Sequence, residues 1–410
     1  YYTTSYQELF NGSLDHNISI AEHFLNYIRN IFIELADYRS LELFQNQNHR
    51  TDYLLIKQSR IVAMTYTQAA LLQSKLVELG FTYDSLFLED SSQKFEVETL
   101  IPILLQRPES LQTHKLKRII LTGDLIQIPL VSNPVLEKYC HLNQSMMNRF
   151  IRLGVHYIEL EKQEKVRPEI FKLFNWRYNS KTDHQDFGTE SLFSKPNPGF
   201  VHPVQIINVS EFEGKGESLT EDQSSYYNLG EAEYVVAVYQ YMRLLGYPAN
   251  KITILTPYSG QCQLIQTIID FRCKKSYFGP PNQVTTINEY NREHNEYILL
   301  SLVRTSSIDW TFDIQRLLMS CSFAKLGLYI FCRRELFENY WELKQLFHQL
   351  KNDSSSLQLL KNENWLTERS IDEEIDSNNI VCVKDVIEMG VIVYEKTVEV
   401  TSTKKKNNAK

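Results

Sequence analysis

The chain has 410 residues, of which 43% are hydrophobic and 23% charged, and its formal net charge is −7. This composition is typical of globular proteins and excludes an intrinsically disordered chain, while the length allows two or three domains with sizeable cores. The acidic balance excludes a strong positive field over the whole molecule, so a nucleic-acid site has to be local or completed by a partner.

The first half of the chain predicts a long helix followed by alternating strands and helices. The chain opens with Tyr1 and not with methionine, and we expect a piece of a longer protein. Residues 15–47 carry apolar side chains near helical spacing. Strands are then predicted at 60–66, 85–90, 118–124 and 156–160, with helices at 67–79 and 95–105. Strands that alternate with helices of this length are typical of a parallel sheet with crossover connections.

The second half repeats the pattern after a predicted linker at 195–200 and a surface insertion at 211–225. Strands are predicted at 204–209, 251–258, 283–288, 297–303 and 326–333, and helices at 230–246, 260–271 and 312–322. After residue 350 the composition becomes acidic and polar, and we expect a loosely ordered tail. The predicted domains are therefore a helical lead-in or insertion at 1–50, two α/β lobes at 51–194 and 195–345, and a partly disordered C-terminal extension at 346–410.

The counts of special residues and segments exclude several kinds of site. The six cysteines contain no CxxC pair, which disfavours a zinc site or a disulfide framework. No apolar run is long enough to cross a bilayer, so no membrane partner is expected. No GxGxxG follows a predicted strand, which disfavours a dinucleotide-binding enzyme.

Polar residues stand at the ends of the predicted strands in the first half of the chain. Ligands of open α/β sheets bind at this edge, so these side chains are candidate site residues. Their order is that of an NTPase lobe, in which one acid holds Mg²⁺, its neighbour orients the attacking water and a polar residue contacts the γ-phosphate. A plain turn is the alternative for each group taken alone. The residues are Thr65, Glu89, Asp90, Gly123, Asp124 and Gln127.

From about residue 50 to 345 an ordered series of motifs resembles the superfamily 1 RNA helicases of the nonsense-decay group. The resemblance implies an α/β fold of the P-loop NTPase/helicase type with tandem RecA-like lobes, nucleotide in the cleft and RNA across the top face. No GxxxxGK[ST] occurs in the chain, so the first lobe is expected to be incomplete at its N-terminus. The motifs include "IVAMTYTQAAL", "SLFLEDSSQ", "RIILTGDLIQIPLV", "FNWRYN", "NLGEAEYVVAVYQYMRLLGY", "TPYSGQ", "YILLSLVRT" and "AKLGLYIF".

The resemblance also implies roles for individual residues. Glu89 would hold Mg²⁺ beside Asp90, with the family's order of the two acids inverted, and Gln127 would contact the γ-phosphate. Gly123, Asp124 and Arg304 would line the nucleotide, although Arg304 could equally pair with an acid. Lys165 stands where the family has an arginine, and it keeps the charge but loses the two-pronged phosphate geometry. The family's Gln-Gly-x-Glu becomes Asn-Arg-Glu-His at 291–294.

The last motif departs most from the family, because Phe323 and Lys325 replace the arginines of Ser/Thr-Arg-Ala-Arg. Loss of an arginine finger typically lowers the rate of phosphoryl transfer by about 10³-fold or more. We therefore expect weak or absent ATP hydrolysis, with ATP and Mg²⁺ as cofactors only if the nucleotide site is retained.

RNA contacts are implied at the ends of strands and at a helix start. Hydroxyls and backbone amides at such places bind phosphate without sequence preference. Tyr258 could stack on a base or pack at the strand end. The implied RNA-binding residues are Thr65, Thr256, Tyr258, Gln261 and Thr286.

Within this family the motifs are most similar to the intron-binding, helicase-like component of the spliceosome. The resemblance implies a nuclear pre-mRNA splicing factor that binds intron RNA and spliceosomal proteins. Two alternatives stay open: an active ATP-dependent 3′-5′ RNA helicase of the spliceosome, and a protein-interaction scaffold that does not bind RNA.

Overall fold

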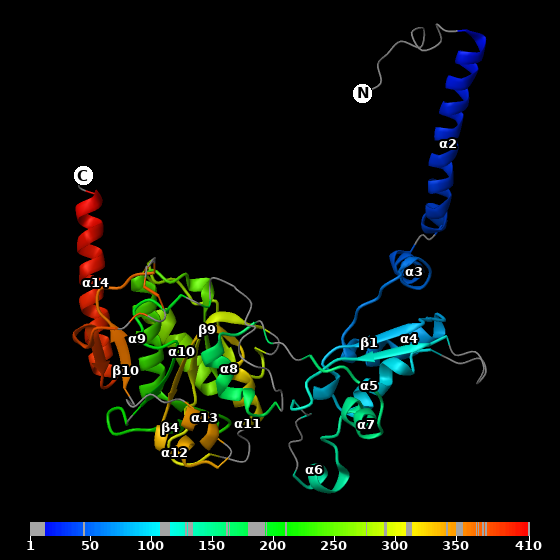
Figure 1. The fold of residues 1–410 in the computed structure, drawn as a ribbon. Helices are drawn as coiled ribbons and strands as arrows, with labels where there is room; N and C mark the ends of the chain where they lie inside the picture. The colour runs from blue at the N-terminus through cyan, green and yellow to red at the C-terminus, as the bar shows by residue number, and fades with distance from the viewer. Residues whose placement is uncertain are drawn as a thin grey trace. The chain divides into compact units, whose positions relative to one another are not determined.

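The computed structural model divides the chain into two compact units, residues 1–157 and 158–410 (Figure 1). The structure describes residues 13–43, 46–106, 115–127, 129, 134–160, 163, 165–178, 193, 195–209, 211–275, 277–290, 293–308, 314–341, 343–349, 356–365, 367, 369–370, 373 and 375–408. Positions 291 and 292 of the "NREH" element, for which the sequence predicts a departure from the family, lie outside the described residues. No described helix combines the length and apolar character needed to cross a bilayer.

Unit 1 contains a parallel pair of strands with helices around it. β1 (Ser85–Leu88) pairs in register with β2 (Arg118–Leu121). Helices α4 and α5 share a small core of Ala69, Leu76, Phe81 and Leu105. The helical elements are α2 (Leu14–Leu43), α3 (Gln47–Tyr53), the π-helix η1 (Leu54–Gln58), α4 (Tyr66–Glu78), the 3₁₀-helix η2 (Ser91–Gln93), α5 (Glu96–Ile103), α6 (Pro134–Cys140) and α7 (Met146–Arg152).

Two strands predicted in unit 1 do not form. Residues 61–65 have no strand structure and lead into α4, and residues 156–160, which span the boundary between the units, have none either. A strand requires a neighbour that satisfies its backbone groups, and no described segment pairs with either stretch. The predicted helices at 15–47, 67–79 and 95–105 are confirmed as α2, α4 and α5.

Unit 2 is built on a five-stranded, fully parallel sheet with the order β3-β9-β8-β6-β7. The strands are β3 (Val204–Asn208), β6 (Ile252–Thr256), β7 (Gln283–Thr286), β8 (Asn295–Ser301) and β9 (Ala324–Cys332). A two-stranded hairpin, β4 (Glu217–Leu219) and β5 (Tyr226–Asn228), precedes the first large helix. All five predicted strands of this half are confirmed.

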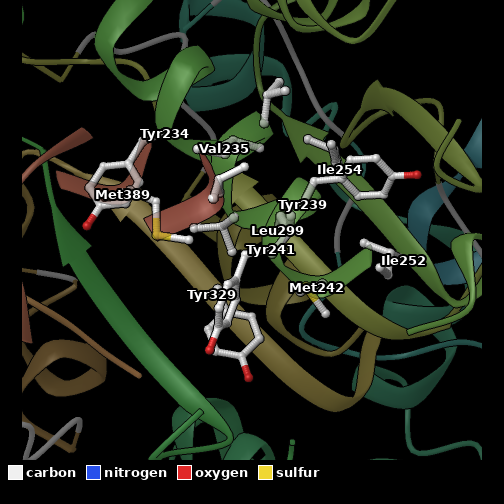
Figure 2. Packing of buried hydrophobic residues seen from close by; sticks show 14 of the residues in the cluster. Tyr234, Val235, Tyr239, Tyr241, Met242, Ile252, Ile254, Leu299, Tyr329 and Met389 are labelled. Carbon is white, nitrogen blue, oxygen red and sulfur yellow. The ribbon is translucent and has the colours of Figure 1, made fainter. Parts of the chain in front are cut away.

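Helices cover both faces of this sheet, as a parallel sheet requires. Side chains alternate along β9, so that Tyr329 and Phe331 point to one core while Leu328 and Ile330 point to the other. The first core lies under α9 (Leu229–Leu245) and α10 (Ser259–Arg272), and Figure 2 shows its α9 residues packed against Ile254 and Leu299 of the sheet. The second core holds α8 (Pro168–Asn175), α11 (Ile314–Cys321), α12 (Arg334–Glu338) and α13 (Lys344–Gln349).

The described part of the C-terminal tail is folded onto unit 2, which corrects the expectation of a loosely ordered segment. β10 (Leu357–Leu360) and β11 (Ile380–Val383) form an antiparallel pair. Helix α14 (Val386–Asn408) packs against α9, and its Met389 and Val393 are buried in the first core. Figure 2 shows Met389 beside Tyr234 of α9. The remaining 3₁₀-helices of unit 2 are η4 (Ala249–Lys251) and η5 (Ser377–Asn379).

Residues 196–200 are buried, so the interpretation of 195–200 as a linker is wrong. Asn197 explains why, because its amide donates to Leu326 O at 3.2 Å and to the Tyr329 hydroxyl at 3.0 Å. Its Oδ1 accepts from the guanidinium of the buried Arg167 at 3.2 Å. Arg167 precedes α8, which belongs to unit 2 by its contacts, whereas the sequence interpretation assigns residues up to 194 to the first lobe.

Candidate nucleotide and nucleic-acid sites

The predicted site residues of unit 1 meet at the C-terminal edge of the β1–β2 pair. The backbone N–H of Asp124 donates to Ser92 Oγ at 3.0 Å, which joins the loop after β2 to the turn after β1. Gln127 donates through Nε2 to Asp124 Oδ2 at 2.9 Å, and its Oε1 accepts from Gln93. The amide of Gln127 is therefore held in place by an acid of its own loop and by the neighbouring turn.

Gly123 is required at this junction by the close approach of the two loops. A Cβ atom at position 123 would lie 2.5 Å from Ser92 Oγ and 2.9 Å from the backbone nitrogen of Ser92. No side chain fits at these distances without displacement of the turn that follows Asp90. Gly123 thus allows the strand ends to meet.

Glu89 and Asp90 follow β1 directly, and they differ in their surroundings. Glu89 is exposed, whereas Asp90 is half-buried and adopts the left-handed backbone conformation at φ 49°. Among the described residues no cluster of three or more potential metal ligands occurs. A nucleotide-bound Mg²⁺ takes one or two protein carboxylates and completes its shell with phosphate and water, and the exposed Glu89 fits that requirement.

Thr65 caps helix α4 and lies near the same edge of unit 1. Its Oγ1 accepts from the backbone N–H of Gln68 at 3.1 Å, and the Gln68 side chain accepts from Thr65 N. The next residue, Tyr66, donates its hydroxyl to Glu89 O at 3.0 Å. The hydroxyl of Thr65 is therefore already used as a helix cap, although the residue is exposed.

In unit 2, Phe323 is a core residue. Only 3% of its surface is exposed, and its ring meets Tyr290 edge-on with centroids 5.4 Å apart and His294 at 6.1 Å. The loop before β9 is fixed as well, because Asn295 N donates to Phe323 O at 3.0 Å. The position at which the resemblance implies an arginine in the family is therefore held by a packed aromatic ring.

Lys165 and Lys325 lie near the same histidine. Burial lowers the pKa of His294, and the positive charges of Lys165 and Lys325 lower it further, while its hydrogen bond to Ser322 O opposes the shift. Both lysines are exposed, and Arg167 N donates to Lys325 O at 3.0 Å. Unit 2 therefore brings three of the predicted catalytic positions, 165, 323 and 325, around one half-buried imidazole.

Two of the implied RNA contacts in unit 2 are fully buried. Thr256 ends β6 with no exposed surface, and Gln261 is equally enclosed in α10. The Gln261 amide donates to Asn228 O at 3.1 Å and to Ser301 Oγ at 3.0 Å, and it accepts from Asn228 N at 2.8 Å. Gln261 thus joins α10 to the start of α9 and the end of β8.

The start of α10 is partly occupied by the β4–β5 hairpin. Gly260 N donates to Ser225 Oγ at 3.0 Å, so this helix N-terminus already has one partner for its amides. Tyr258 is half-buried and contacts the ring of Tyr226 edge-on, with centroids 5.5 Å apart. Packing of Tyr258 within unit 2 is therefore observed, and stacking on a base stays a prediction.

Arg304 pairs with an acid of its own unit. It is 2% exposed, its guanidinium carbon lies 3.8 Å from the centroid of Tyr226, and its Nε lies 3.5 Å from Glu217 Oε2. Nε also donates to Ser307 O at 2.8 Å. The acid-pairing alternative accounts for these contacts, and a nucleotide contact by Arg304 stays a prediction.

Thr286 ends β7 and is half-buried beside an acid. Glu289 N donates to Thr286 Oγ1 at 3.4 Å, and the Glu289 carboxylate accepts from the Thr285 hydroxyl at 2.8 Å. The hydrogen bond from the Thr285 hydroxyl, and then that from Thr286 N at 3.5 Å, lower the pKa of the Glu289 carboxyl. An RNA phosphate at Thr286 would have to approach this carboxylate.

Sequence reasoning did not single out Glu231, the most enclosed acid of unit 2. Glu231 has no exposed surface and accepts from Ser301 Oγ at 2.7 Å and from Val303 N at 2.8 Å. Burial raises the pKa of Glu231 to about 8, against the effect of these two hydrogen bonds. The sequence pattern "NLGE" places Asn228 and Glu231 at the N-cap and N3 positions of α9. That pattern predicts a capping box and not the contacts of Glu231 with Ser301 and Val303.

Residues 142–335 match the protein family described as AAA domain. Over 96% of its length the chain is 41% identical to RNA helicase aquarius of Mus musculus, of which it covers 27%. The chain is a relative of RNA helicase aquarius.

The aquarius resemblance extends to further proteins. The chain is 30% identical over 85% of its length to pre-mRNA-splicing factor cwf11 of Schizosaccharomyces pombe, of which it covers 27%. It is 26% identical over 61% of its length to Regulator of nonsense transcripts 1 of Dictyostelium discoideum, of which it covers 18%. These relatives and the parallel sheet of unit 2 confirm the resemblance to superfamily 1 helicases and the predicted α/β fold of the RecA-like helicase type.

The chain spans about a quarter of the length of the first two relatives. The activities that the names of these relatives describe therefore belong to longer proteins.

Proposed function

We propose that the chain is the motor-type region of a nuclear pre-mRNA splicing factor that binds intron RNA and spliceosomal proteins and has weak or absent ATP hydrolysis. The similarity to proteins named RNA helicase aquarius and pre-mRNA-splicing factor cwf11 supports the assignment to splicing. The order of the strand-end residues in unit 1 supports an origin as an NTPase lobe.

The burial of Phe323 is the observation that carries the proposal of weak hydrolysis. An arginine finger has to reach the γ-phosphate with a charged, flexible side chain, whereas Phe323 is 3% exposed and packed between Tyr290 and His294. The two nearby lysines supply positive charge but not the planar, two-pronged geometry of arginine. Binding of a nucleotide and its turnover are therefore separable in this site.

ATP hydrolysis by the full-length protein, measured with and without single-stranded RNA, tests the proposed loss of turnover. We expect a rate at background in both cases, and no recovery in a Lys165→Arg variant, because the finger position remains aromatic. RNA-stimulated hydrolysis that disappears in a Glu89→Gln variant would support the active helicase instead.

RNA binding requires a separate measurement, because an RNA-binding splicing factor and a protein scaffold that does not bind RNA would both lack ATP hydrolysis. Crosslinking of the full-length protein to intron RNA in spliceosomes is expected to yield adducts within residues 158–345. A Tyr258→Ala variant removes a ring that could stack on a base, and stacking contributes about 1–3 kcal/mol per base, so binding should weaken by roughly 5-fold to 100-fold. Intact incorporation into spliceosomes without any RNA adduct would favour the scaffold.

A further inference from the structure

Val303 forms a strained turn directly after the central strand β8. Its φ is 73°, a value that β-branched residues rarely adopt, and Arg304 N donates to Leu302 O at 2.8 Å across it. A three-residue turn with a positive central φ is the uncommon, strained kind of γ-turn. Val303 is also completely buried, so its side chain cannot relax toward solvent. Such strain persists only where the surrounding structure holds it.

Side chains from the start of α9 hold both peptide groups of this turn. Glu231 Oε2 accepts from Val303 N at 2.8 Å, and Asn228 Nδ2 donates to Val303 O at 3.2 Å. The same carboxyl oxygen accepts from the hydroxyl of Ser301 at 2.7 Å. The N-cap and N3 residues of α9 therefore bind the backbone N–H and the backbone C=O of the strained residue.

Gln261 accepts the hydrogen bond that Glu231 would otherwise accept in the helix cap, and this leaves Glu231 available for Val303. In a capping box the N3 side chain returns to the backbone N–H of the N-cap residue. Here Asn228 N donates instead to Gln261 Oε1 at 2.8 Å. The Glu231 carboxyl is thereby free to reach across to β8. The three buried polar side chains form one connected unit, which we call the α9 clamp and define as Asn228, Glu231 and Gln261.

The turn determines where Arg304 lies, and Arg304 in turn contacts the β4–β5 hairpin. Its guanidinium is stacked on Tyr226 of β5 and lies beside Glu217 of β4. Glu217 also accepts from Thr305 N at 2.6 Å, and Tyr226 contacts Tyr258. A change in the backbone at Val303 would therefore move Tyr226 and, through it, Tyr258 at the start of α10.

We propose that Glu231 is a positioning residue, which together with Asn228 holds the strained turn at Val303 and thereby fixes Arg304, the β4–β5 hairpin and Tyr258 in a single arrangement. Ser301 lies between Glu231 and Gln261, the nearest of the predicted RNA-binding residues. Glu231 would therefore influence RNA binding through the turn at Val303. The consequence for RNA rests on the proposed function, whereas the fixing of the hairpin does not.

Amide hydrogen exchange of the 410-residue chain tests the clamp without reference to RNA. A Glu231→Ala variant should accelerate exchange in residues 217–228 and 301–306 by roughly tenfold, since strained backbone of this kind involves about 1–3 kcal/mol. Glu231→Gln keeps a carbonyl oxygen for Val303 N and Ser301, and it should stay within about twofold of the parent chain. The matched control is Glu233→Ala, which removes an acid of the same helix that pairs with the exposed Arg272 at 2.7 Å and should change neither segment.

A second variant separates strain from packing. Glycine adopts a positive φ at no steric cost, so Val303→Gly should reduce the additional effect of Glu231→Ala on the hairpin when the two are combined. Three results would overturn the clamp and indicate a general loosening of the core. They are additive effects of the two substitutions on hairpin exchange, faster hairpin exchange in Glu231→Gln, and an equal acceleration of exchange in β3.

Affinity for a single-stranded oligouridine, measured on the same variants, tests the consequence for RNA. We expect Glu231→Ala to weaken binding about as much as Tyr258→Ala, and Glu231→Gln to leave it unchanged. Absence of binding by the parent chain would contradict the proposed function and leave the exchange result to decide on the clamp. Unchanged binding by Glu231→Ala, with an accelerated hairpin, would overturn the link from the clamp to RNA.

Discussion

The predicted motor residues of the two units differ in how they are built into the fold. In unit 1, Asp124 and Gln127 are partly exposed at a strand edge and are linked by hydrogen bonds between polar side chains. In unit 2 the predicted catalytic position 323 carries a phenylalanine, which belongs to the hydrophobic core. The predicted site of unit 1 is therefore a polar strand edge, whereas position 323 of unit 2 is a packing position.

If the proposed function is correct, this difference explains how a motor-type fold could persist without ATP turnover. A polar side chain at a strand end contributes little to the core, so its retention is compatible with a site for nucleotide. An aromatic residue in place of an arginine adds buried apolar area and stabilises the loop before β9. Under the proposed function, a phenylalanine at position 323 would lower the rate of phosphoryl transfer and at the same time stabilise unit 2.

Substitution of Phe323 is expected to have the largest effect. Phe323→Ala should lower the free energy of unfolding of unit 2 by about 3–5 kcal/mol, and Phe323→Arg by at least as much, because a buried phenyl ring is lost and a charge has no prepared partner. Denaturant unfolding of the 410-residue chain measures both. Phe87→Ala in unit 1 is the control, since Phe87 is 60% exposed and should change stability by less than about 0.5 kcal/mol. Equal losses of unfolding free energy in Phe87→Ala and Phe323→Ala would contradict the difference that we describe between the two units.

The second effect is a pH dependence that arises in unit 2. The pKa of Glu231 is about 8 in the folded chain and about 4.5 in the unfolded chain, so the folded state binds the extra proton between these values. The free energy of unfolding should therefore fall as the pH rises from 4.5 to 8, and the total loss should be on the order of a few kcal/mol. Unfolding measured at several pH values should show this slope, and Glu231→Gln should remove it. A slope that survives in Glu231→Gln would contradict the assignment.

Gly123→Ala should destabilise unit 1 by about 1–3 kcal/mol, because the new methyl group would meet Ser92 at 2.5 Å. Gly390→Ala in α14 is the matched control, since nothing lies within 4 Å of a Cβ there and alanine favours the helix. Thermal unfolding followed for each unit distinguishes the two. A neutral Gly123→Ala would show that the two loops of unit 1 can separate freely.

Gln127→Ala is expected to have the smallest effect, about 1 kcal/mol, because the lost hydrogen bonds to Asp124 and Gln93 are partly exposed. Its effect on nucleotide affinity of the full-length protein should exceed its effect on stability if Gln127 contacts phosphate. A purely structural Gln127 would show the reverse order.

The sequence predicts the periodic elements of unit 2 well and its non-local contacts poorly. The runs that form α9 and β6 are apolar and bounded by capping or turn residues, so the local pattern is sufficient to predict them. The stretch Pro196-Asn197-Pro198-Gly199 reads as a linker, and only the folded sheet reveals that Asn197 binds Leu326 and Tyr329. The same limit explains why 60–66 was predicted as a strand, since pairing depends on a neighbour elsewhere in the chain.

The candidate site follows a similar division. The meeting of Asp124 and Gln127 with the turn after β1 could be predicted, because parallel strand ends share one edge. The burial of Gln261 and the role of Glu231 could not, since both depend on three segments that meet only in the fold. Their hydrogen bonds to Asn228, Ser301 and Val303 connect residues that are 33 to 72 positions apart.

RNA-stimulated ATP hydrolysis by the full-length protein tests the central contrast most directly. We predict that the protein binds single-stranded RNA while its hydrolysis stays at background at saturating ATP, Mg²⁺ and RNA. A robust RNA-stimulated rate that is lost in Glu89→Gln would contradict the account, because it would show that turnover proceeds with a buried phenylalanine at position 323.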